Sequence, residues 1–252
     1  MLKPLECPVC GGVCNPLDVV DFNKTCLEFP EDPLPLAGIP VYYYLCGQCA
    51  FCFAPEFAAW TLEDFTNRIY NSDYGRFDPD YRDKRPRNNA MDLINAFGHR
   101  ALEFKHLDYG GGAGLLSGLL RQSDWQSQSY DPFVDRDVGL GQLGKFDLIT
   151  AYEVFEHVPD VRQLIDNLSN LLKINGVIFF STLVSDGNLD PRQRLTWWYA
   201  SPRNGHISLF SRKSLAVLGA SQGFTFGSFS DVYHAYWGKE VPAWASHVIR
   251  QG

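Results

Sequence analysis

A glycine-rich segment directly behind an apolar stretch constrains the fold more than any other feature of this sequence. Residues 106–116 read HLDYGGGAGLL, in which four of the five positions 110–114 are glycine. A strand before such glycines and a helix after them form a unit whose free backbone N–H groups and helix N-terminus face a ligand. The segment therefore predicts a ligand site at the carboxyl end of a strand.

The chain around this loop alternates between strand and helix patterns. Strand patterns occupy residues 102–109, 127–133, 145–155 and 177–184, and helix patterns occupy 88–102, 114–122 and 160–173. Pro86 is expected to break the chain before the first of these helices. Regular alternation of this kind predicts an α/β fold in which helices cover both faces of a mostly parallel sheet.

The segment 160–173 carries the clearest helical pattern. Its apolar residues recur at helical spacing, at Val161, Leu164, Ile165, Leu168 and Leu172. Gly176 is expected to end the helix in a left-handed conformation. Further along the chain, Ser211 is expected to cap a helix that contains Leu215 and Leu218.

The overall charge argues against some classes of partner. The formal net charge is −7 over 252 residues, whereas proteins that bind nucleic acids usually present a basic surface. No apolar run approaches the roughly 18 to 20 residues that span a bilayer, and the first residues lack the apolar core of a signal peptide. We therefore expect a cytoplasmic protein without nucleic acid or membrane as partner.

All seven cysteines lie within the first 52 residues. Cys7 and Cys10 form one C-x-x-C turn, and Cys46 and Cys49 form another. Two such turns can offer four thiolates to one structural zinc ion, so they predict a zinc ribbon. The remaining cysteines, Cys14, Cys26 and Cys52, are expected to be small buried residues, with Cys14 or Cys52 as a substitute ligand.

These patterns divide the chain into three parts. Residues 1–60 are expected to form the zinc-ribbon module, 61–87 a linker or arm, and 88–252 the α/β domain. The arm is rich in tyrosine and is expected either to fold over the ligand or to remain a solvated linker. Its candidate contact residues are Tyr74, Arg76, Tyr81 and Arg82.

The spacing of the glycines selects among nucleotide-binding patterns. A dinucleotide pattern G-x-G-x-x-G fails in both registers, and the absence of G-K-[ST] excludes a P-loop. The pattern D-x-G-x-G-x-G fits Asp108, Gly110, Gly112 and Gly114. Together with SYDPF, KFDLITAYEVFEHVPD and LLKINGVIFFSTL in this order, it resembles the motifs of class I S-adenosylmethionine-dependent methyltransferases over about residues 88–230.

The resemblance implies a fold, a cofactor and its contacts. It implies a doubly wound, Rossmann-like, mostly parallel seven-stranded sheet preceded by the small zinc-ribbon module. The glycine loop would approach the methionine part of S-adenosylmethionine, Asp131 would hold the ribose hydroxyls, and Glu153 would line the cofactor. The implied cofactor-binding residues are Asp108, Gly110, Gly112, Gly114, Asp131 and Glu153.

The segment after the last strand pattern is expected to serve the methyl acceptor. It contains Trp197, Trp198 and His206, and it resembles small-molecule methyltransferases that act on sugars or natural products, some of which carry an N-terminal zinc module. A histidine can accept a proton from a hydroxyl, so His206 is the candidate general base. Alternatively, His206 ties its loop to backbone carbonyls. His157 is expected to be a solvated or helix-capping residue, or else catalytic.

The sequence thus predicts a methyltransferase for a small-molecule acceptor, with a structural zinc ion. Two alternatives remain open. One is an RNA-modifying methyltransferase that grips nucleic acid with the zinc ribbon, and the other is a non-catalytic docking module that keeps a cofactor pocket. The identity of the acceptor atom and the oligomeric state are not predicted.

Overall fold

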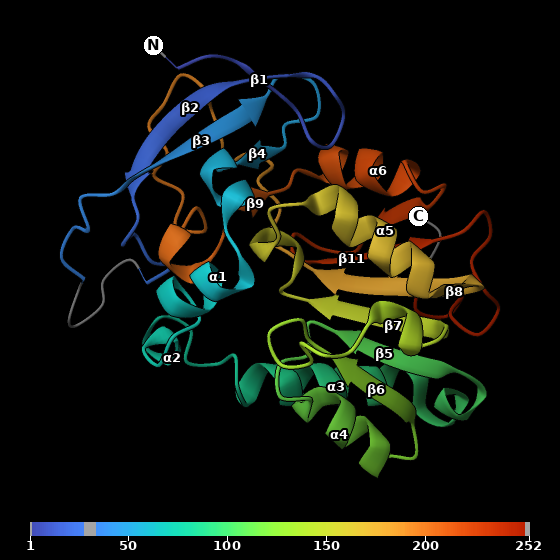
Figure 1. Ribbon diagram of the computed structural model, residues 1–252. Coiled ribbons are helices and arrows are strands. Elements are labelled where there is room, and N and C mark those ends of the chain that lie inside the picture. Colours follow the sequence, from blue (N-terminus) through green and yellow to red (C-terminus); the bar gives the residue numbers. More distant parts are fainter. Residues whose placement is uncertain (1, 28–33, 250–252) are drawn as a thin grey trace. The chain divides into compact units, whose positions relative to one another are not determined.

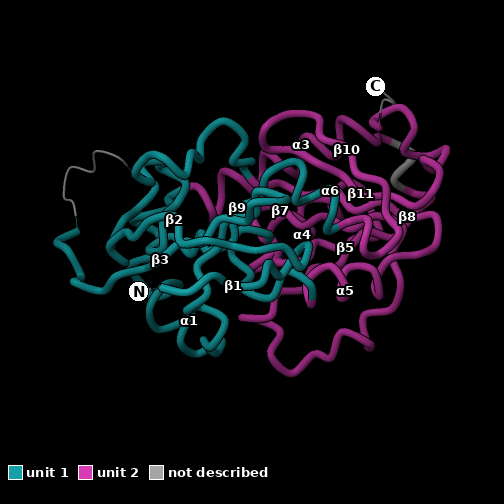
Figure 2. The backbone as a smooth tube through the Cα atoms, turned by 90° about the horizontal axis from the view of Figure 1, so that it is seen from above, with its two compact units in different colours: residues 1–79, 155–162, 183–218 teal, residues 80–154, 163–182, 219–252 magenta. Residues whose placement is uncertain are grey.

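The computed structural model describes residues 2–27 and 34–249, with the main chain alone for residues 99–101. The backbone divides into two compact units, coloured separately in Figure 2. Unit 1 comprises Met1–Pro79, Phe155–Arg162 and Leu183–Leu218. Unit 2 comprises Asp80–Val154, Gln163–Thr182 and Gly219–Gly252. Each unit therefore combines segments far apart in the sequence, and the division at residues 60 and 87 stays a prediction.

Unit 2 contains a sheet of six strands within its described residues, in the order β10-β11-β8-β7-β5-β6 (Figure 1). The strands are β5 (Lys105–Tyr109), β6 (Gln126–Tyr130), β7 (Phe146–Tyr152), β8 (Leu172–Ser181), β10 (Thr225–Ser228) and β11 (Tyr233–Trp237). β6, β5, β7 and β8 are mutually parallel, whereas β11 and β10 run antiparallel to their neighbours. The mostly parallel α/β sheet predicted from the alternation is confirmed.

The expected count of seven strands is wrong for the described residues. β6 and β7 are joined by residues 131–145, which contain only the short 3-10 helix η3 (Leu140–Gln142). A single crossover between parallel strands takes about a dozen residues or more. The connection therefore has room for one crossover but not for an additional strand with a second crossover.

The helices of unit 2 pack on the two faces of this sheet. They are α3 (Lys84–Phe97), the 3-10 helix η2 (Gly98–Glu103), α4 (Leu115–Gln122) and most of α5 (Val161–Leu171). Figure 1 shows α3 and α4 on one side of the sheet and α5 on the other. This two-sided cover accounts for the nearly continuous apolar runs of the central strands.

The main core of unit 2 lies between α3, α4 and one face of the sheet. Alternate residues of β7, β8 and β11 point to this face, because successive side chains of a strand point to opposite sides. Its buried residues are Ala90, Leu93, Phe97, Phe104, Leu116, Leu120, Trp125, Leu148, Val177, Phe179, Ala235, Trp237, Ala245 and Ile249. The expected helix over 88–102 is thus a core helix.

Two expectations about helix ends are wrong. α3 begins at Lys84 and includes Pro86, which is tolerated because N–H groups in the first turn have no partner within the helix. The chain passes from α5 directly into β8, and Gly176 lies inside that strand. A Cβ on Gly176 would lie 2.7 Å from Cδ1 of Leu172 and 2.9 Å from the Asp147 carbonyl oxygen. Close packing therefore requires this glycine, and no left-handed turn does.

Unit 1 is built on an antiparallel sheet with the order β1-β2-β3-β4-β9 (Figure 1). Its strands in the described part of the chain are β1 (Leu5–Glu6), β2 (Val13–Asp21), β3 (Pro40–Cys46), β4 (Cys52–Phe53) and β9 (Ser208–Leu209). The β2–β3 register shifts between Pro16 and Asp18, where proline supplies no N–H to the ladder. β9 pairs with β4 through Cys52 and Leu209, so a distant segment completes the cysteine-bearing sheet.

Several short helices lie before, between and after the strands of this sheet along the chain. They are η1 (Pro55–Ala59), α1 (Leu62–Arg68), α2 (Tyr74–Phe77), η4 (Phe155–His157), η5 (Pro202–Asn204) and most of α6 (Arg212–Ala220). α1 starts at a capping box in which Thr61 and Asp64 bond each other's backbone N–H groups. The segment 61–87 therefore contains regular helices.

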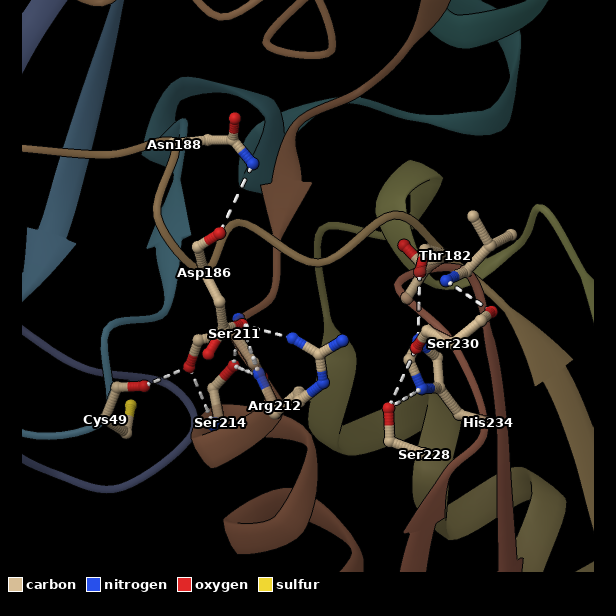
Figure 3. A network of polar contacts seen from close by, with 11 residues as sticks. Cys49, Thr182, Asp186, Asn188, Ser211, Arg212, Ser214, Ser228, Ser230 and His234 are labelled. Atoms are coloured by element: carbon tan, nitrogen blue, oxygen red, sulfur yellow. Dashed lines mark hydrogen bonds and ion pairs between the residues drawn. The ribbon is translucent and has the colours of Figure 1, made fainter.

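The expected cap of the helix near residue 215 is confirmed. The Ser211 hydroxyl accepts the N–H of Ser214 at 3.0 Å, and the Ser214 hydroxyl accepts the N–H of Ser211 at 2.9 Å. The Ser211 hydroxyl also donates to the carbonyl of Cys49 at 2.6 Å (Figure 3). One side chain thus starts α6 and links it to the second C-x-x-C turn.

None of the helices within the described ranges is both long and apolar enough to span a bilayer.

Candidate functional site

The glycine-rich loop that joins β5 to α4 depends on left-handed backbone. The φ angle is +75° at Gly110, +54° at Gly112 and +77° at Gly114, values that residues with a side chain rarely adopt. Gly111 is constrained by packing instead, because a Cβ there would lie 2.3 Å from Oγ of Ser129. Backbone geometry therefore favours glycine at three of the positions, and packing requires it at Gly111.

One side of the loop presents bare main chain. A Cβ on Gly112 would meet no atom within 4 Å, and Gly112 is exposed. Gly114 immediately precedes Leu115, the first residue of α4. The first N–H groups of a helix have no partner within it and favour negative or polar ligand groups. The loop and the start of α4 can therefore bind the polar part of a ligand through the backbone.

Asp131 follows β6 and lies beside the loop. Its Oδ2 accepts the N–H of Gly112 at 2.9 Å, and its Oδ1 accepts the N–H of Phe133 at 2.8 Å. The residue is 9% exposed. The structure thus brings together two of the sequence-predicted cofactor residues, Gly112 and Asp131, from adjacent strands of the sheet.

Asp108 is buried beneath the same loop. A Cβ on Gly111 would lie 2.4 Å from its Oδ2, and the hydroxyl of Thr150 donates to its Oδ1 at 2.8 Å. Burial, together with the smaller effect of the nearby Asp131 charge, raises the pKa of Asp108 to about 7 against the lowering effect of the hydrogen bond from Thr150. The carboxyl group therefore changes its charge near neutral pH.

A buried histidine that sequence reasoning missed supports Asp108. His106 Nε2 lies 3.0 Å from Oγ1 of Thr150, and its Nδ1 lies 2.8 Å from Oγ of Ser127. The hydroxyls of Ser127 and Ser117 are 2.9 Å apart. Burial lowers the pKa of His106 to about 3, so the imidazole is neutral. The signal in the sequence was a histidine two residues before Asp108, on the same face of a strand.

Glu153 stands at the end of β7 in a left-handed conformation, with a φ of +53°. Its N–H donates to the carbonyl of Ser181 at 3.2 Å and to the hydroxyl of that residue at 2.9 Å. The same hydroxyl donates to Oε1 of Glu153 at 2.7 Å. Strained backbone of this kind persists where the surroundings over-determine it, often at functional sites. The loop, Asp131 and Glu153 thus lie at the carboxyl ends of three parallel strands, where open α/β sheets bind ligands.

The four cysteines predicted as metal ligands lie together in unit 1. All four sulfur atoms are within 4.8 Å of one another. Cys7 Sγ lies 3.6 Å from Cys49 Sγ, and Cys10 Sγ lies 3.5 Å from Cys46 Sγ. Zinc–sulfur bonds of about 2.3 Å in a tetrahedron place the sulfurs about 3.8 Å apart. The donor set and its spacing therefore fit one zinc ion.

Backbone N–H groups favour thiolates in this cluster. The N–H groups of Gln48 and Cys49 point at Cys46 Sγ at 3.4 and 3.5 Å. The pKa of Cys7 falls to about 5, first because the Cys49 thiol donates to it and against the raising effect of burial, whereas the same contact raises the pKa of Cys49. The thiolate is the form that binds metal, so the two N–H groups that point at Cys46 Sγ suit a metal-bound sulfur.

The remaining cysteines have different surroundings. They lie outside the four-sulfur group. Cys14 and Cys52 are fully buried, and burial raises the pKa of both thiols. Burial likewise raises the pKa of Cys26 to about 12. These three thiols stay protonated at neutral pH; the expected burial is confirmed for Cys14 and Cys52, whereas Cys26 is only partly buried.

His206 is buried in unit 1 beside a glutamate and a second histidine. Its Nδ1 lies 2.9 Å from the carbonyl oxygen of Tyr199 and 3.5 Å from Sγ of Cys26. Because a carbonyl only accepts hydrogen bonds, Nδ1 carries the proton and Nε2 carries the lone pair. The ring centroid of His157 is 4.9 Å away, and Glu156 completes the group. The alternative in which His206 ties its loop to a backbone carbonyl is thus confirmed, while its role as a base stays a prediction.

The aromatic candidates for the acceptor site have different exposures. Trp197 is buried, with its ring centroid 5.3 Å from that of Tyr199, whereas Trp198 is 39% exposed.

The Tyr74 hydroxyl donates to the carbonyl of Asn204 at 3.3 Å. Tyr74 therefore serves the packing of unit 1.

The other arm residues make local contacts. The guanidinium of Arg76 lies 5.7 Å from the ring centroid of Phe77, and Nε of Arg82 donates to the hydroxyl of Tyr81 at 2.6 Å. Tyr81 and Arg82 belong to unit 2, and Arg76 belongs to unit 1. Contact of these residues with a ligand stays a prediction.

Comparisons with known proteins bear on the region that contains the glycine loop. A family model described as "Methyltransferase domain" matches residues 81–227, more than half of the chain. The "Ubiquinone biosynthesis O-methyltransferase" of Pasteurella multocida (strain Pm70) is 44% identical over 73 residues, 27% of this chain and 29% of that protein. The protein of the same name from Acinetobacter baumannii (strain AYE) is 30% identical over 105 residues, 41% of this chain and 42% of that protein. The chain spans less than half the length of both relatives.

A solved structure shares the fold. It is the 1,6-didemethyltoxoflavin-N1-methyltransferase of Burkholderia thailandensis with bound 1,6-didemethyltoxoflavin and S-adenosylhomocysteine. The TM-score is 0.50 at 17% sequence identity, and the match covers 78% of this chain and 98% of that chain. This structural match covers a larger share of the chain than the sequence matches to the two ubiquinone biosynthesis relatives do.

Proposed function

This chain belongs to the class I S-adenosylmethionine-dependent methyltransferases, and from that premise we propose that it methylates a small-molecule acceptor of the sugar or natural-product type. One observation carries the proposal. The glycine loop after β5 presents bare main chain, and the Asp131 carboxylate lies against that loop through the N–H of Gly112. Backbone that is open on one side and flanked by an acid suits a nucleoside with free hydroxyls.

We assign the cofactor contacts to the ends of the parallel strands. Gly110, Gly112 and Gly114 would allow the methionine part of the cofactor to approach the main chain. Asp131 would accept hydrogen bonds from the ribose hydroxyls, and Glu153 would line the site at the end of β7. Asp108 would support the loop from below, because its carboxyl group lies beneath Gly111.

The chemistry asks little of the protein besides alignment. S-adenosylmethionine, when bound, supplies a methyl group made electrophilic by the positive sulfur. The protein holds the acceptor in line with that methyl group and excludes water. Where the acceptor is a hydroxyl, a base must take its proton. His206 is the proposed base, because its Nδ1–H donates to a carbonyl and its lone pair is on Nε2.

Two observations favour a small acceptor over RNA. The net charge is −7, which disfavours a phosphate backbone as partner. The Pasteurella multocida relative is named for O-methylation in ubiquinone biosynthesis, which supports a small molecule with a hydroxyl acceptor.

We further propose that zinc at Cys7, Cys10, Cys46 and Cys49 is structural and that the protein is cytoplasmic, consistent with its free cysteines.

The test is methyl transfer from labelled cofactor. The full chain is incubated with methyl-labelled S-adenosylmethionine and, in separate arms, nucleotide sugars, catechols and other phenols, and RNA. We expect label in a small-molecule arm with wild type and, at limiting cofactor, at least tenfold less with Asp131→Ala. Label in RNA alone would establish the RNA-modifying alternative. Binding of S-adenosylhomocysteine without transfer in any arm would favour the non-catalytic docking module and overturn the proposed activity.

A further inference from the structure

Glu156, His157 and His206 form a second group of potential metal ligands within unit 1. One ligand atom from each lies within 4.8 Å of the others. Glu156 and His157 come from η4, and His206 precedes β9. The four-cysteine cluster supplies only sulfur, whereas this Glu–His–His cluster supplies two imidazole nitrogens and a carboxylate. The two groups therefore suit different ions or different roles.

The carboxylate of this cluster is completely buried. Glu156 has 0% exposure, and a buried carboxylate is costly unless its charge is compensated. Its Oε1 accepts a hydrogen bond from the Tyr199 hydroxyl at 2.6 Å and lies 4.0 Å from Nε2 of His157. A divalent cation between the carboxylate and the two imidazoles would compensate the charge directly.

The orientation of His206 matches that of a metal ligand. Its Nδ1–H donates to the carbonyl of Tyr199 at 2.9 Å, so the lone pair is on Nε2. Metal-ligating histidines almost always donate their other N–H to a carbonyl, a carboxylate or water, which fixes the tautomer and the ring. Tyr199 thus holds two ligands at once, His206 through its carbonyl and Glu156 through its hydroxyl.

Backbone contacts fix the two segments that carry the ligands. The N–H of Ile207 donates to the carbonyl of Glu156 at 2.9 Å, and the Ser208 hydroxyl donates to the carbonyl of Val158 at 2.7 Å. Gly205 has a φ of +86°, and a Cβ there would lie 2.9 Å from Nδ1 of His157. The cluster is therefore pre-organised by the chain on both sides of the ligands.

We propose that Glu156, His157 and His206 bind a divalent first-row transition-metal ion such as Zn²⁺ or Co²⁺. Two imidazoles and one carboxylate suit these ions, whereas Mg²⁺ and Ca²⁺ prefer sites made of oxygen. Three protein ligands leave a coordination position open, as in catalytic rather than structural zinc sites. The open position takes water or a hydroxyl group.

This site changes the role of His206 in the proposed reaction. With an ion bound, the lone pair on Nε2 of His206 coordinates the ion. His206 then cannot also take the proton from the substrate hydroxyl. A hydroxyl bound to the ion would instead lose its proton to solvent more readily, because the cation stabilises the oxyanion. This consequence rests on the proposed methyl transfer, whereas the metal site itself does not.

Metal content tests the site directly. The full chain is stripped with a chelator, dialysed against Zn²⁺ with excess Mg²⁺ and analysed for bound zinc. We expect two zinc ions per wild-type chain and one per chain for Glu156→Gln, which preserves the shape of the side chain. Cys49→Ser should also retain one, and the double variant none. A wild-type chain with a single zinc, or Glu156→Gln with two, would overturn the proposal.

Two further measurements guard against variants that fail to fold. Co²⁺ titration of the wild type should give two spectroscopically distinct sites, one with thiolate-to-cobalt charge-transfer absorption and one without it. His247→Ala replaces an exposed histidine whose Nε2 lies 2.7 Å from the Ala96 carbonyl oxygen, and it should keep two ions. A Co²⁺ titration that shows only the thiolate site would contradict the proposal without any substitution. Neither measurement depends on methyl transfer.

Discussion

Gly111 shows how closely a single residue controls the loop after β5. A Cβ at this position would lie 2.3 Å from Oγ of Ser129 and 2.4 Å from Oδ2 of Asp108. Gly111→Ala must therefore shift the loop or Asp108, and we expect a loss of about 1 to 3 kcal/mol in the free energy of unfolding. Denaturant unfolding of wild type and Gly111→Ala measures this loss.

A matched control exists for this prediction. A Cβ on Gly141 would meet no atom within 4 Å, so Gly141→Ala should change stability little. If Gly111→Ala is as stable as Gly141→Ala, the packing around Asp108 is looser than described.

Asp131 supports a prediction about ligand binding. Its carboxylate would accept hydrogen bonds from the ribose, and bonds to charged groups contribute about 1.5 to 3 kcal/mol each. Asp131→Ala should therefore weaken binding of S-adenosylhomocysteine at least tenfold by calorimetry while the zinc content stays the same. Asp137→Ala, an exposed residue of the same connection, is the control and should bind as wild type. Equal affinity of the two variants would remove Asp131 from the cofactor site.

Asp108 makes stability depend on pH in a definite direction. Its pKa is raised from 3.8 to about 7 in the folded chain, so the folded state retains a proton that the unfolded state has lost. This contribution to stability is complete below about pH 4 and is lost as the pH rises through 7. An asparagine side chain does not titrate, so the Asp108→Asn variant does not lose this stability as the pH rises.

The stability of Asp108→Asn relative to wild type should therefore increase between pH 5 and pH 8. We expect a gain on the order of 2 kcal/mol, since each pKa unit corresponds to about 1.4 kcal/mol. Denaturant unfolding at the two pH values measures it. A constant difference, or one that falls with pH, would show that Asp108 is already ionised in the folded chain.

At the scale of elements, the start of α6 depends on Ser211. Its hydroxyl accepts the N–H of Ser214 and donates to the carbonyl of Cys49 (Figure 3). Ser211→Ala leaves both buried groups without this partner, and we expect a loss of about 1 to 2 kcal/mol in unfolding free energy. Ser246→Ala removes an exposed hydroxyl bonded to the Ala243 carbonyl and should cost less than about 0.5 kcal/mol. Equal effects would contradict a capping role.

Element boundaries were harder to predict than element types. The buried stripe of α5 follows directly from the side-chain pattern, because burial of one face of a helix imposes the helical period. The predictions of a break at Pro86 and of a helix end at Gly176 were wrong because each residue type occurs in more than one structural setting. Proline is tolerated in a first helical turn, and glycine also serves close packing, here against Leu172.

At the scale of the whole molecule, the cysteine cluster makes a prediction about independence. Cys46→Ser removes one thiolate, so zinc bound at this cluster should fall from one ion per chain to less than about 0.1, given the steep dependence of structural sites on four ligands. Cys52→Ala removes a buried cysteine outside the cluster and should keep the ion. The thiolate-to-cobalt charge-transfer absorption of each variant after Co²⁺ titration measures both, because this band reports the cysteine cluster alone.

The same pair of variants tests the separation of zinc from cofactor binding. Binding of S-adenosylhomocysteine should persist in Cys46→Ser, because the glycine loop and Asp131 belong to unit 2 and the cysteines to unit 1. Simultaneous loss of zinc and cofactor binding would show that unit 2 does not keep its structure without the metal.

The sequence by itself determined the features that depend on neighbouring residues. The C-x-x-C turns, the glycine-rich loop before α4 and the alternation of strands with helices are all local, and local backbone and side-chain chemistry decides them. The tertiary structure alone decided the pairing of β9 with β4, the order of the six strands in the described sheet of unit 2, the His106 network beneath Asp108, and the assembly of Glu156, His157 and His206. These depend on contacts between residues far apart in the chain, and no local pattern specifies which distant segments will meet.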